Sequence, residues 1–168
     1  GKTIGYLTGY SIYNQLGLTT QISNTIQIGR NVVRPSFKLE RFTISFIKQK
    51  NIITKENISL LQILDSMRYI KKIPDTTIAA SCKRFIFLIN NMTEKEKNTM
   101  IRLAMKYNPF TRALLGALME NSGNMDIAEK LKKSLNPITS YNLSGIQNTL
   151  ETAKNWNILS EAKDQTSI

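Results

Sequence analysis

The sequence predicts an α+β fold: a small antiparallel or mixed sheet near the N-terminus, followed by a bundle of about five helices. Three observations support this prediction. Apolar and polar residues alternate with the two-residue period of strands in the first third of the chain. From about Lys55 the apolar residues recur at helical spacing. Proline, glycine and N-capping residues then divide that part into segments of helix length.

A length of 168 residues favours one domain, which we expect to cover residues 1–160. Its sheet-rich part spans residues 1–53 and its helical part residues 54–135, and an extended or irregular part follows at 136–160. The last residues, 161–168, are expected to form a disordered tail.

The sheet-rich part opens with a block, Gly5 to Gly29, that holds no charged residue and must therefore pack against something. A short helix is predicted after Thr8, whose hydroxyl would cap it, and Gly17 would end it. Strands are predicted at 25–28 and, most clearly, at 41–48, with a loop or sheet edge around Pro35. Because the connection is too short for a helical crossover, we expect the two strands to pair antiparallel.

Five helices are predicted in the helical part, with approximate limits 55–73, 76–92, 94–107, 110–121 and 126–135. Thr54 and Asp75 are the expected N-caps of the first two, and Thr93 with Glu96 forms a capping box for the third. The fourth helix is apolar almost all the way round, which places it at the centre of the core or in an interface. Trp156 is expected to anchor the C-terminal part to the body of the domain.

The composition excludes several kinds of site. There is no histidine, which removes histidine bases, triads and His-ligated metals. The single cysteine, Cys82, falls in step with apolar residues, so we interpret it as a small core residue. No apolar run is long enough to span a bilayer, so we expect a cytoplasmic protein without a membrane partner.

A helix-loop-strand opening with a glycine turn is superficially similar to a nucleotidyltransferase active site. That chemistry needs paired carboxylates to hold divalent metals, and the strand at Thr25 to Gln27 has none. Asp65 is interpreted as a solvated helix carboxylate paired with Arg68. We therefore expect no enzyme, no catalytic residue, no metal and no cofactor.

The formal net charge of +11 and the pI of about 9.8 indicate an anionic partner. Basic residues across the sheet and the first two helices could form a docking surface for phosphates or an acidic protein, or could be solvated faces without a partner. The predicted interaction surface consists of Arg30, Arg34, Lys38, Arg41, Lys48, Lys50, Arg68, Lys71, Lys72, Lys83 and Arg84.

Several segments together resemble the AbiEi-type antitoxins of type IV toxin–antitoxin systems, in a poorly characterised branch of that family. They are Tyr6-Leu7-Thr8-Gly9, Leu16-Gly17-Leu18-Thr19-Thr20-Gln21, Asn24-Thr25-Ile26, Arg41-Phe42-Thr43-Ile44, Leu60-Leu61-Gln62-Ile63-Leu64-Asp65, Tyr69-Ile70-Lys71-Lys72-Ile73-Pro74-Asp75-Thr76 and Thr111-Arg112-Ala113-Leu114-Leu115-Gly116-Ala117-Leu118. The resemblance covers roughly residues 5–145 and concerns the C-terminal antitoxin domain of the family.

The resemblance implies a non-catalytic domain that neutralises a cognate nucleotidyltransferase-like toxin, by direct contact or functionally, within a transcriptional autoregulator. Such antitoxins bind their own promoter DNA through an N-terminal winged helix. The resemblance does not include that winged helix, and since the chain does not begin with Met, we expect it to lie in upstream residues that were removed. The alternative hypothesis is a basic nucleic-acid-binding module of a transcriptional regulator, which would contact DNA through the basic surface.

Overall fold

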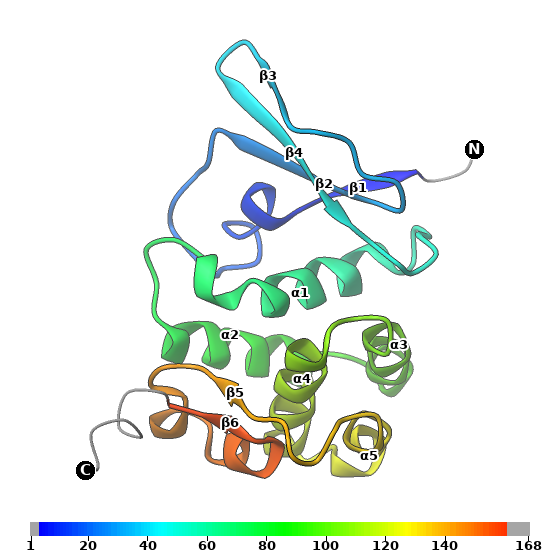
Figure 1. Cartoon of the computed structure of the whole chain (residues 1–168), viewed down its shortest axis with the longest axis vertical. Helices are drawn as coiled ribbons and strands as arrows, with labels where there is room; N and C mark the ends of the chain where they lie inside the picture. The colour runs from blue at the N-terminus through cyan, green and yellow to red at the C-terminus, as the bar shows by residue number, and fades with distance from the viewer. Residues whose placement is uncertain (1–3, 161–168) are drawn as a thin grey trace. The chain divides into compact units, whose positions relative to one another are not determined.

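The computed structural model describes residues 4–160 and has the predicted α+β architecture, with a four-stranded mixed sheet followed by helices (Figure 1). The chain divides into two compact units, the first ending at Thr76 and the second beginning at Thr77. Each unit is described by itself below. The expectation of one domain over residues 1–160 stays a prediction, and the predicted tail at 161–168 lies outside the described residues.

The sheet of the first unit has the strand order β1-β2-β4-β3. Its strands are β1 (Gly5–Thr8), β2 (Thr25–Arg30), β3 (Phe37–Leu39) and β4 (Phe42–Lys48). β1 pairs antiparallel with β2, and β3 pairs antiparallel with β4. β2 and β4 are parallel, so the predicted antiparallel pairing is wrong. The connection between them reverses direction twice, once in a loop after β2 and once in the β3–β4 hairpin, and it needs no helix.

The short helix predicted after Thr8 is confirmed only in part. Gly5–Thr8 is a strand, and the helix that follows it is a 3-10 turn, η1 (Gly9–Ser11), continued by further turns to the left-handed Gly17. The Thr8 hydroxyl does not cap this turn. Instead Gln27 of β2 holds it, because its Oε1 atom accepts a hydrogen bond of 2.9 Å from the backbone N–H of Tyr10. The turn is thus tied to the neighbouring strand by a side chain, and backbone bonds from the Tyr13 N–H to Gly9 and from the Leu16 N–H to Ile12 continue it.

One helix, α1 (Ile58–Arg68), packs on the sheet of the first unit, and a 3-10 turn, η2 (Ile70–Lys72), follows it (Figure 1). The helix is shorter than predicted at both ends. Asn57 occupies the N-cap position, while the hydroxyl of Thr54 accepts a bond from the Asn57 N–H one turn earlier. Between Leu60 and Met67 the helix is buried nearly all the way round, and the hydrogen bonds of Asp65 to Tyr6 and Thr8 identify the side that faces the sheet.

Between Thr77 and residue 160 the second unit contains four α-helices: α2 (Ile78–Asn90), α3 (Glu94–Ala104), α4 (Pro109–Asn121) and α5 (Met125–Lys133). Thr77 caps α2 by accepting from the Ala80 N–H at 3.0 Å, so the predicted cap at Asp75 is wrong. The capping box of Thr93 and Glu96 is confirmed. The predicted central position of α4 is also confirmed. This helix contacts α2, α3 and α5, and its residues from Ala113 to Met119 are all buried.

The C-terminal part of the described chain packs on α4. It comprises the strands β5 (Tyr141–Asn142) and β6 (Ile158–Leu159), which pair in parallel, and the 3-10 turns η3 (Ile146–Asn148) and η4 (Glu151–Trp156). The buried ring of Trp156 lies on Gly116 so closely that a Cβ atom there would stand 2.2 Å from the ring. Its Nε1–H donates to Glu120 at 2.9 Å. The predicted anchoring role of Trp156 is confirmed.

Two further predictions concern burial. Cys82 is a free, completely buried residue of α2, as expected, and burial raises the pKa of its thiol to about 12. Among residues 4–160, no helix combines the length and the apolar character that crossing a bilayer requires.

Candidate binding surface on the sheet

The two faces of the sheet are defined by strand register. Tyr6 and Thr8 of β1 point toward α1, where both donate hydrogen bonds to Asp65. Residues directly opposite one another on paired strands share a face. Gln27 and Gly29 therefore lie on this inner face with Tyr6 and Thr8, and so do their partners on β4. The alternate residues form the other face, called the outer face below.

The outer face is apolar on all four strands. It carries Leu7 from β1, Ile26 and Ile28 from β2, Phe42, Ile44 and Phe46 from β4, and Phe37 and Leu39 from β3. Three of these side chains, at the two edge strands, are far from buried: Leu7 is 50%, Phe37 46% and Leu39 59% exposed. A contiguous apolar patch that stays open to solvent is characteristic of an interaction site.

A hollow of about 300 Å³ lies at one end of the outer face. Its lining residues are Ile4, Gly5, Ile28, Arg30, Arg34, Phe37, Ile44 and Phe46. The phenyl rings of Phe37 and Phe46 contact each other there, with their centroids 6.3 Å apart. The hollow thus combines apolar walls with two guanidinium groups.

Arg30 has an unusual environment at this hollow. Its Nε atom is buried and has no hydrogen-bond partner among the described residues. Lys48 is its neighbour in register on β4, and a second guanidinium, that of Arg34, lines the same hollow. Because leaving a buried donor without a partner is costly, a water molecule or a bound acceptor at this hollow would satisfy the N–H.

All but one of the charged side chains in this part of the chain are basic. Between residues 4 and 54, Glu40 is the single acidic residue. Arg41, next to it in the β3–β4 turn, stacks on the Phe42 ring with its Cζ atom 4.9 Å from the centroid. Cations therefore stand at both ends of the outer face: Arg30 and Arg34 line the hollow, Lys48 lies beside Arg30 in register, and Arg41 is at the opposite end. The rows of side chains between them are apolar.

The other predicted basic residues do not extend this arrangement. In register, Lys38 lies opposite Thr43 and so belongs to the side away from the outer face. Lys50 lines a separate shallow hollow with Asn31 and Asn51. Arg68 and Lys72 both lie over the ring of Tyr69, and Lys71 lies between them in sequence. Lys83 and Arg84 belong to α2, in the second unit.

Among the residues interpreted from the sequence, Asp65 has the environment that differs most from the prediction. It is completely buried, and its Oδ2 atom accepts hydrogen bonds from the Tyr6 hydroxyl at 2.6 Å and the Thr8 hydroxyl at 2.7 Å. The interpretation as a solvated carboxylate paired with Arg68 is wrong, because Asp65 lies on the helix face that the sheet covers. Arg68 instead stacks on Tyr69.

Further polar groups extend this buried cluster. Gln49 donates from its Nε2 atom to the Tyr6 hydroxyl at 2.9 Å, and its Oε1 atom accepts from the backbone and the side chain of Asn51. Nearby, burial raises the pKa of Tyr13, and the charges of Tyr10 and Asp65 raise it further. The Tyr13 phenol therefore stays protonated at neutral pH. The carboxylate of Asp65 is engaged in holding β1 to α1.

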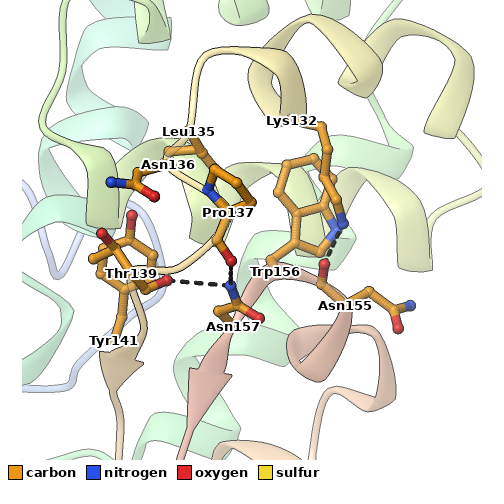
Figure 2. A pocket seen from close by; sticks show the side chains of 9 residues that line it. All are labelled: Lys132, Leu135, Asn136, Pro137, Thr139, Tyr141, Asn155, Trp156 and Asn157. Atoms are coloured by element: carbon orange, nitrogen blue, oxygen red, sulfur yellow. Dashed lines mark hydrogen bonds between the residues drawn. The ribbon is translucent and has the colours of Figure 1, made fainter.

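A second hollow, of about 90 Å³, lies in the second unit between the loop after α5 and η4 (Figure 2). Its polar groups mostly satisfy one another. Figure 2 shows the Lys132 ammonium bonded to the Asn155 carbonyl, and Asn157 donating to the carbonyls of Pro137 and Thr139 at 3.0 and 3.2 Å. Lys132 also lies 4.4 Å from the centroid of a Trp156 ring. The small volume and these internal bonds favour a packing role.

Sequence reasoning missed the outer face, although one signal was present. The polar residues of β1 and β2 fall on the same side as Asp65, which leaves the apolar side of the alternation facing away from α1.

No group of three or more histidine, cysteine, aspartate or glutamate residues in the described part of the chain is arranged to hold a metal ion. No protein-family model, curated protein or solved structure matches this chain.

Proposed function

We propose that this chain is a non-catalytic antitoxin domain that neutralises a cognate nucleotidyltransferase-type toxin in the cytoplasm, as part of a larger transcriptional autoregulator. The observation that carries the proposal is the outer face, on which apolar side chains line all four strands, those of the two edge strands are exposed, and cations stand at both ends. An apolar centre with a charged rim is the arrangement of a protein–protein interface. The resemblance to AbiEi-type antitoxins supplies the class of partner.

The environment of Asp65 supports a non-catalytic role. General acid–base catalysis needs a carboxyl group that can reach a substrate. The carboxylate of Asp65 is completely buried and already accepts from two hydroxyl groups. Catalytic histidines are absent from the sequence. The described features therefore favour binding over chemistry.

Co-expression tests this proposal directly. The chain, joined to the upstream part of its natural protein, is expressed with the nucleotidyltransferase-like product of the adjacent gene, and growth is recorded. We expect the toxin alone to arrest growth and the pair to restore it. A matched control expresses the toxin with the same protein truncated before Gly5. If the complete antitoxin does not restore growth, the proposal is wrong.

The hollow also favours a second candidate function, a nucleic-acid-binding module of a transcriptional regulator. Arginines beside an exposed phenyl ring, here that of Phe37, can bind phosphates while the ring stacks on a base. This function predicts retention of DNA that weakens steeply with salt. Replacing Arg30, Arg34 and Arg41 by Glu should then abolish retention in an electrophoretic mobility assay. Absence of DNA binding by the unmodified chain at low salt would exclude this candidate.

A further inference from the structure

We infer that the outer face pairs with the outer face of a second copy of this chain, with the strands of the two copies running in opposite directions. In this pairing the tip of the β3–β4 hairpin, Leu39 with Glu40, enters the hollow at Arg30 and Arg34 of the other copy. The inference goes beyond the proposed function, because neutralisation of the toxin can be functional and does not require this face to contact it. Three features carry the pairing: the exposed apolar side chains, the position of one carboxylate and the conformation of its residue.

The outer face leaves apolar side chains exposed at both ends of its strands. Ile4, at the hollow, is 68% exposed, and Leu39, at the other end, is also exposed. A monomeric protein rarely leaves a contiguous apolar patch of this kind uncovered. Two sheets cover such faces by packing on one another about 10 Å apart with their strands nearly aligned. A second copy brings the same apolar rows, so each row finds an apolar partner.

The position of Glu40 determines the direction of the pairing. Its turn joins Leu39 to Phe42 at the start of β4, whereas Arg30 is paired with Lys48 at the end of β4, so the turn and the hollow lie at opposite ends of the strands (Figure 1). A copy related by a two-fold axis across the strands keeps the two hairpins over one another and sets each carboxylate at the hollow of the other copy. An axis along the strands would bring the cationic hollows together, which like charges disfavour.

The hollow fits the leucine side chain that precedes this carboxylate. It measures about 300 Å³, and its apolar walls come from three strands, with the residues Ile28, Ile44, Phe37 and Phe46. An apolar cavity of roughly 150 Å³ can hold a benzene molecule, so the hollow has room for Leu39 of a second copy. Interfaces concentrate their binding energy where such a side chain enters a pocket beside a desolvated polar contact.

The charges at the hollow and at the hairpin tip complement each other. Arg30 and Arg34 form no ion pair with any residue of the described chain, and the buried Nε atom of Arg30 has no hydrogen-bond partner there. Glu40 is exposed and forms no ion pair among residues 4–160 either. Arg41 beside it is held over the Phe42 ring. Since guanidinium groups bind carboxylates through two parallel hydrogen bonds, Glu40 of a second copy supplies the acceptor that one chain does not.

The backbone of Glu40 is a separate indication that its carboxylate serves a contact outside the chain. Its φ is 56°, in the left-handed region where hairpin turns prefer glycine or asparagine. A glutamate at this position costs stability in the isolated chain, and no ion pair within the described residues offsets that cost. The contact with a second copy provides the compensation.

The size of the face predicts how strong the pairing is. The strands hold at most seven residues, so one face covers roughly 400 Å² and two copies bury roughly 800 Å² in total. Specific, stable interfaces bury about 1,200–2,000 Å². We therefore expect a weak dimer that dissociates on dilution.

The test uses sedimentation velocity of the complete chain over about a hundredfold range of concentration, which measures the dissociation constant of the dimer. Glu40→Arg and Arg34→Glu each place like charges at both contacts, whereas an equimolar mixture of the two variants pairs opposite charges at both. Glu56→Arg and Lys55→Glu are the matched controls, because they change the charge equally at exposed residues just before α1, the helix on the inner face. Thermal unfolding followed by circular dichroism checks that each variant folds.

We expect Glu40→Arg and Arg34→Glu each to raise the dissociation constant at least about tenfold, and both controls to stay within about threefold of the unmodified chain. The mixture of the two variants should return to within about threefold of the unmodified value. Glu40→Gly removes the carboxylate and the backbone strain together, so it should weaken the dimer while raising the thermal stability of the monomer.

A chain that stays monomeric at every concentration would overturn the inference. Equal losses in variants and controls would do so too, because they would reflect net charge alone, and a mixture that does not recover would exclude the reversed pairing. If the chain is monomeric and Arg34→Glu abolishes binding of an oligonucleotide of about twenty bases or of the purified toxin, the face serves that partner and the inference is wrong. Growth rescue is scored separately, so a failure of the antitoxin function is distinguishable from a failure of the dimer.

Discussion

The two faces of the sheet reverse the usual distribution of polarity. The inner face, which packs on α1, carries Tyr6, Thr8 and Gln27, whose polar atoms are hydrogen-bonded. The outer face, which is exposed at its two edge strands, carries leucine, isoleucine and phenylalanine. In most one-sided sheets the apolar side is the covered one. The comparison shows that alternation identifies a strand without saying which of its faces is buried.

The reversal is possible because the inner polar groups have partners. Asp65 provides a buried acceptor for two hydroxyl groups, and these bonds offset the cost of burying the polar atoms. The apolar side chains of the outer face gain no comparable stabilising contact in the isolated chain. We therefore expect the inner face to determine stability and the outer face to determine binding, and the following substitutions test that division.

The largest effect is expected at Asp65. Replacing Asp65 by Ala leaves the hydroxyls of Tyr6 and Thr8 without their shared acceptor in a buried site, and the free energy of unfolding should fall by about 3 kcal/mol or more. Urea denaturation measures it. Glu56→Ala, at an exposed carboxylate just before α1, is the control and should change stability by less than about 0.5 kcal/mol. Equal costs for the two variants would show that the inner cluster contributes no special stability.

An intermediate effect is expected at Gly29, on which the Tyr6 ring lies. A Cβ atom at Gly29 would stand 2.4 Å from Cζ of that ring, so Gly29→Ala should displace the phenol from Asp65 and cost about 2 kcal/mol. The same substitution in a Tyr6→Ala background should cost much less, because the clash is then absent. Additive losses in this double-mutant cycle would contradict the proposed packing.

The smallest effect on stability is expected at the outer face. Phe37→Ser alters a side chain that is 46% exposed and should change the free energy of unfolding by no more than about 0.5–1 kcal/mol. Ile47→Ser, on the buried side of the same sheet, is the matched control and should cost about 2–4 kcal/mol. If Phe37→Ser destabilised the protein as much as Ile47→Ser, the outer face would be part of the core and not an interaction surface.

Local signals in the sequence were sufficient for the helical part and for two of the strands. A capping box involves residues only three positions apart, so Thr93 and Glu96 could be assigned without any knowledge of the fold. The burial of α4 follows from its apolar residues on every side. The strands β2 and β4 showed clear alternation. In each case the determining interaction lies within one element.

The remaining features depend on contacts between distant residues. β1 has only four residues and buries Tyr6 and Thr8, so its sequence lacks the apolar alternation of a covered strand. β3 has three residues, too few to establish a period, yet it sets the direction in which β4 runs. The partners of Asp65 are 57 and 59 positions away. The candidate surface was missed for the same reason, because a strand's open face is defined by what packs on the other one.

The bond between β1 and Asp65 has a consequence for the order of biosynthesis. A ribosome adds roughly 5–20 residues per second, so Asp65 is joined to the chain about 3–12 s after Tyr6. During that interval the β1 hydroxyls have no carboxylate to bind, and neither sheet face is covered by α1. The nascent sheet therefore presents apolar side chains on one side and unsatisfied polar groups on the other until α1 leaves the exit tunnel. The two faces of the sheet therefore become different in their surroundings only after translation has passed Asp65.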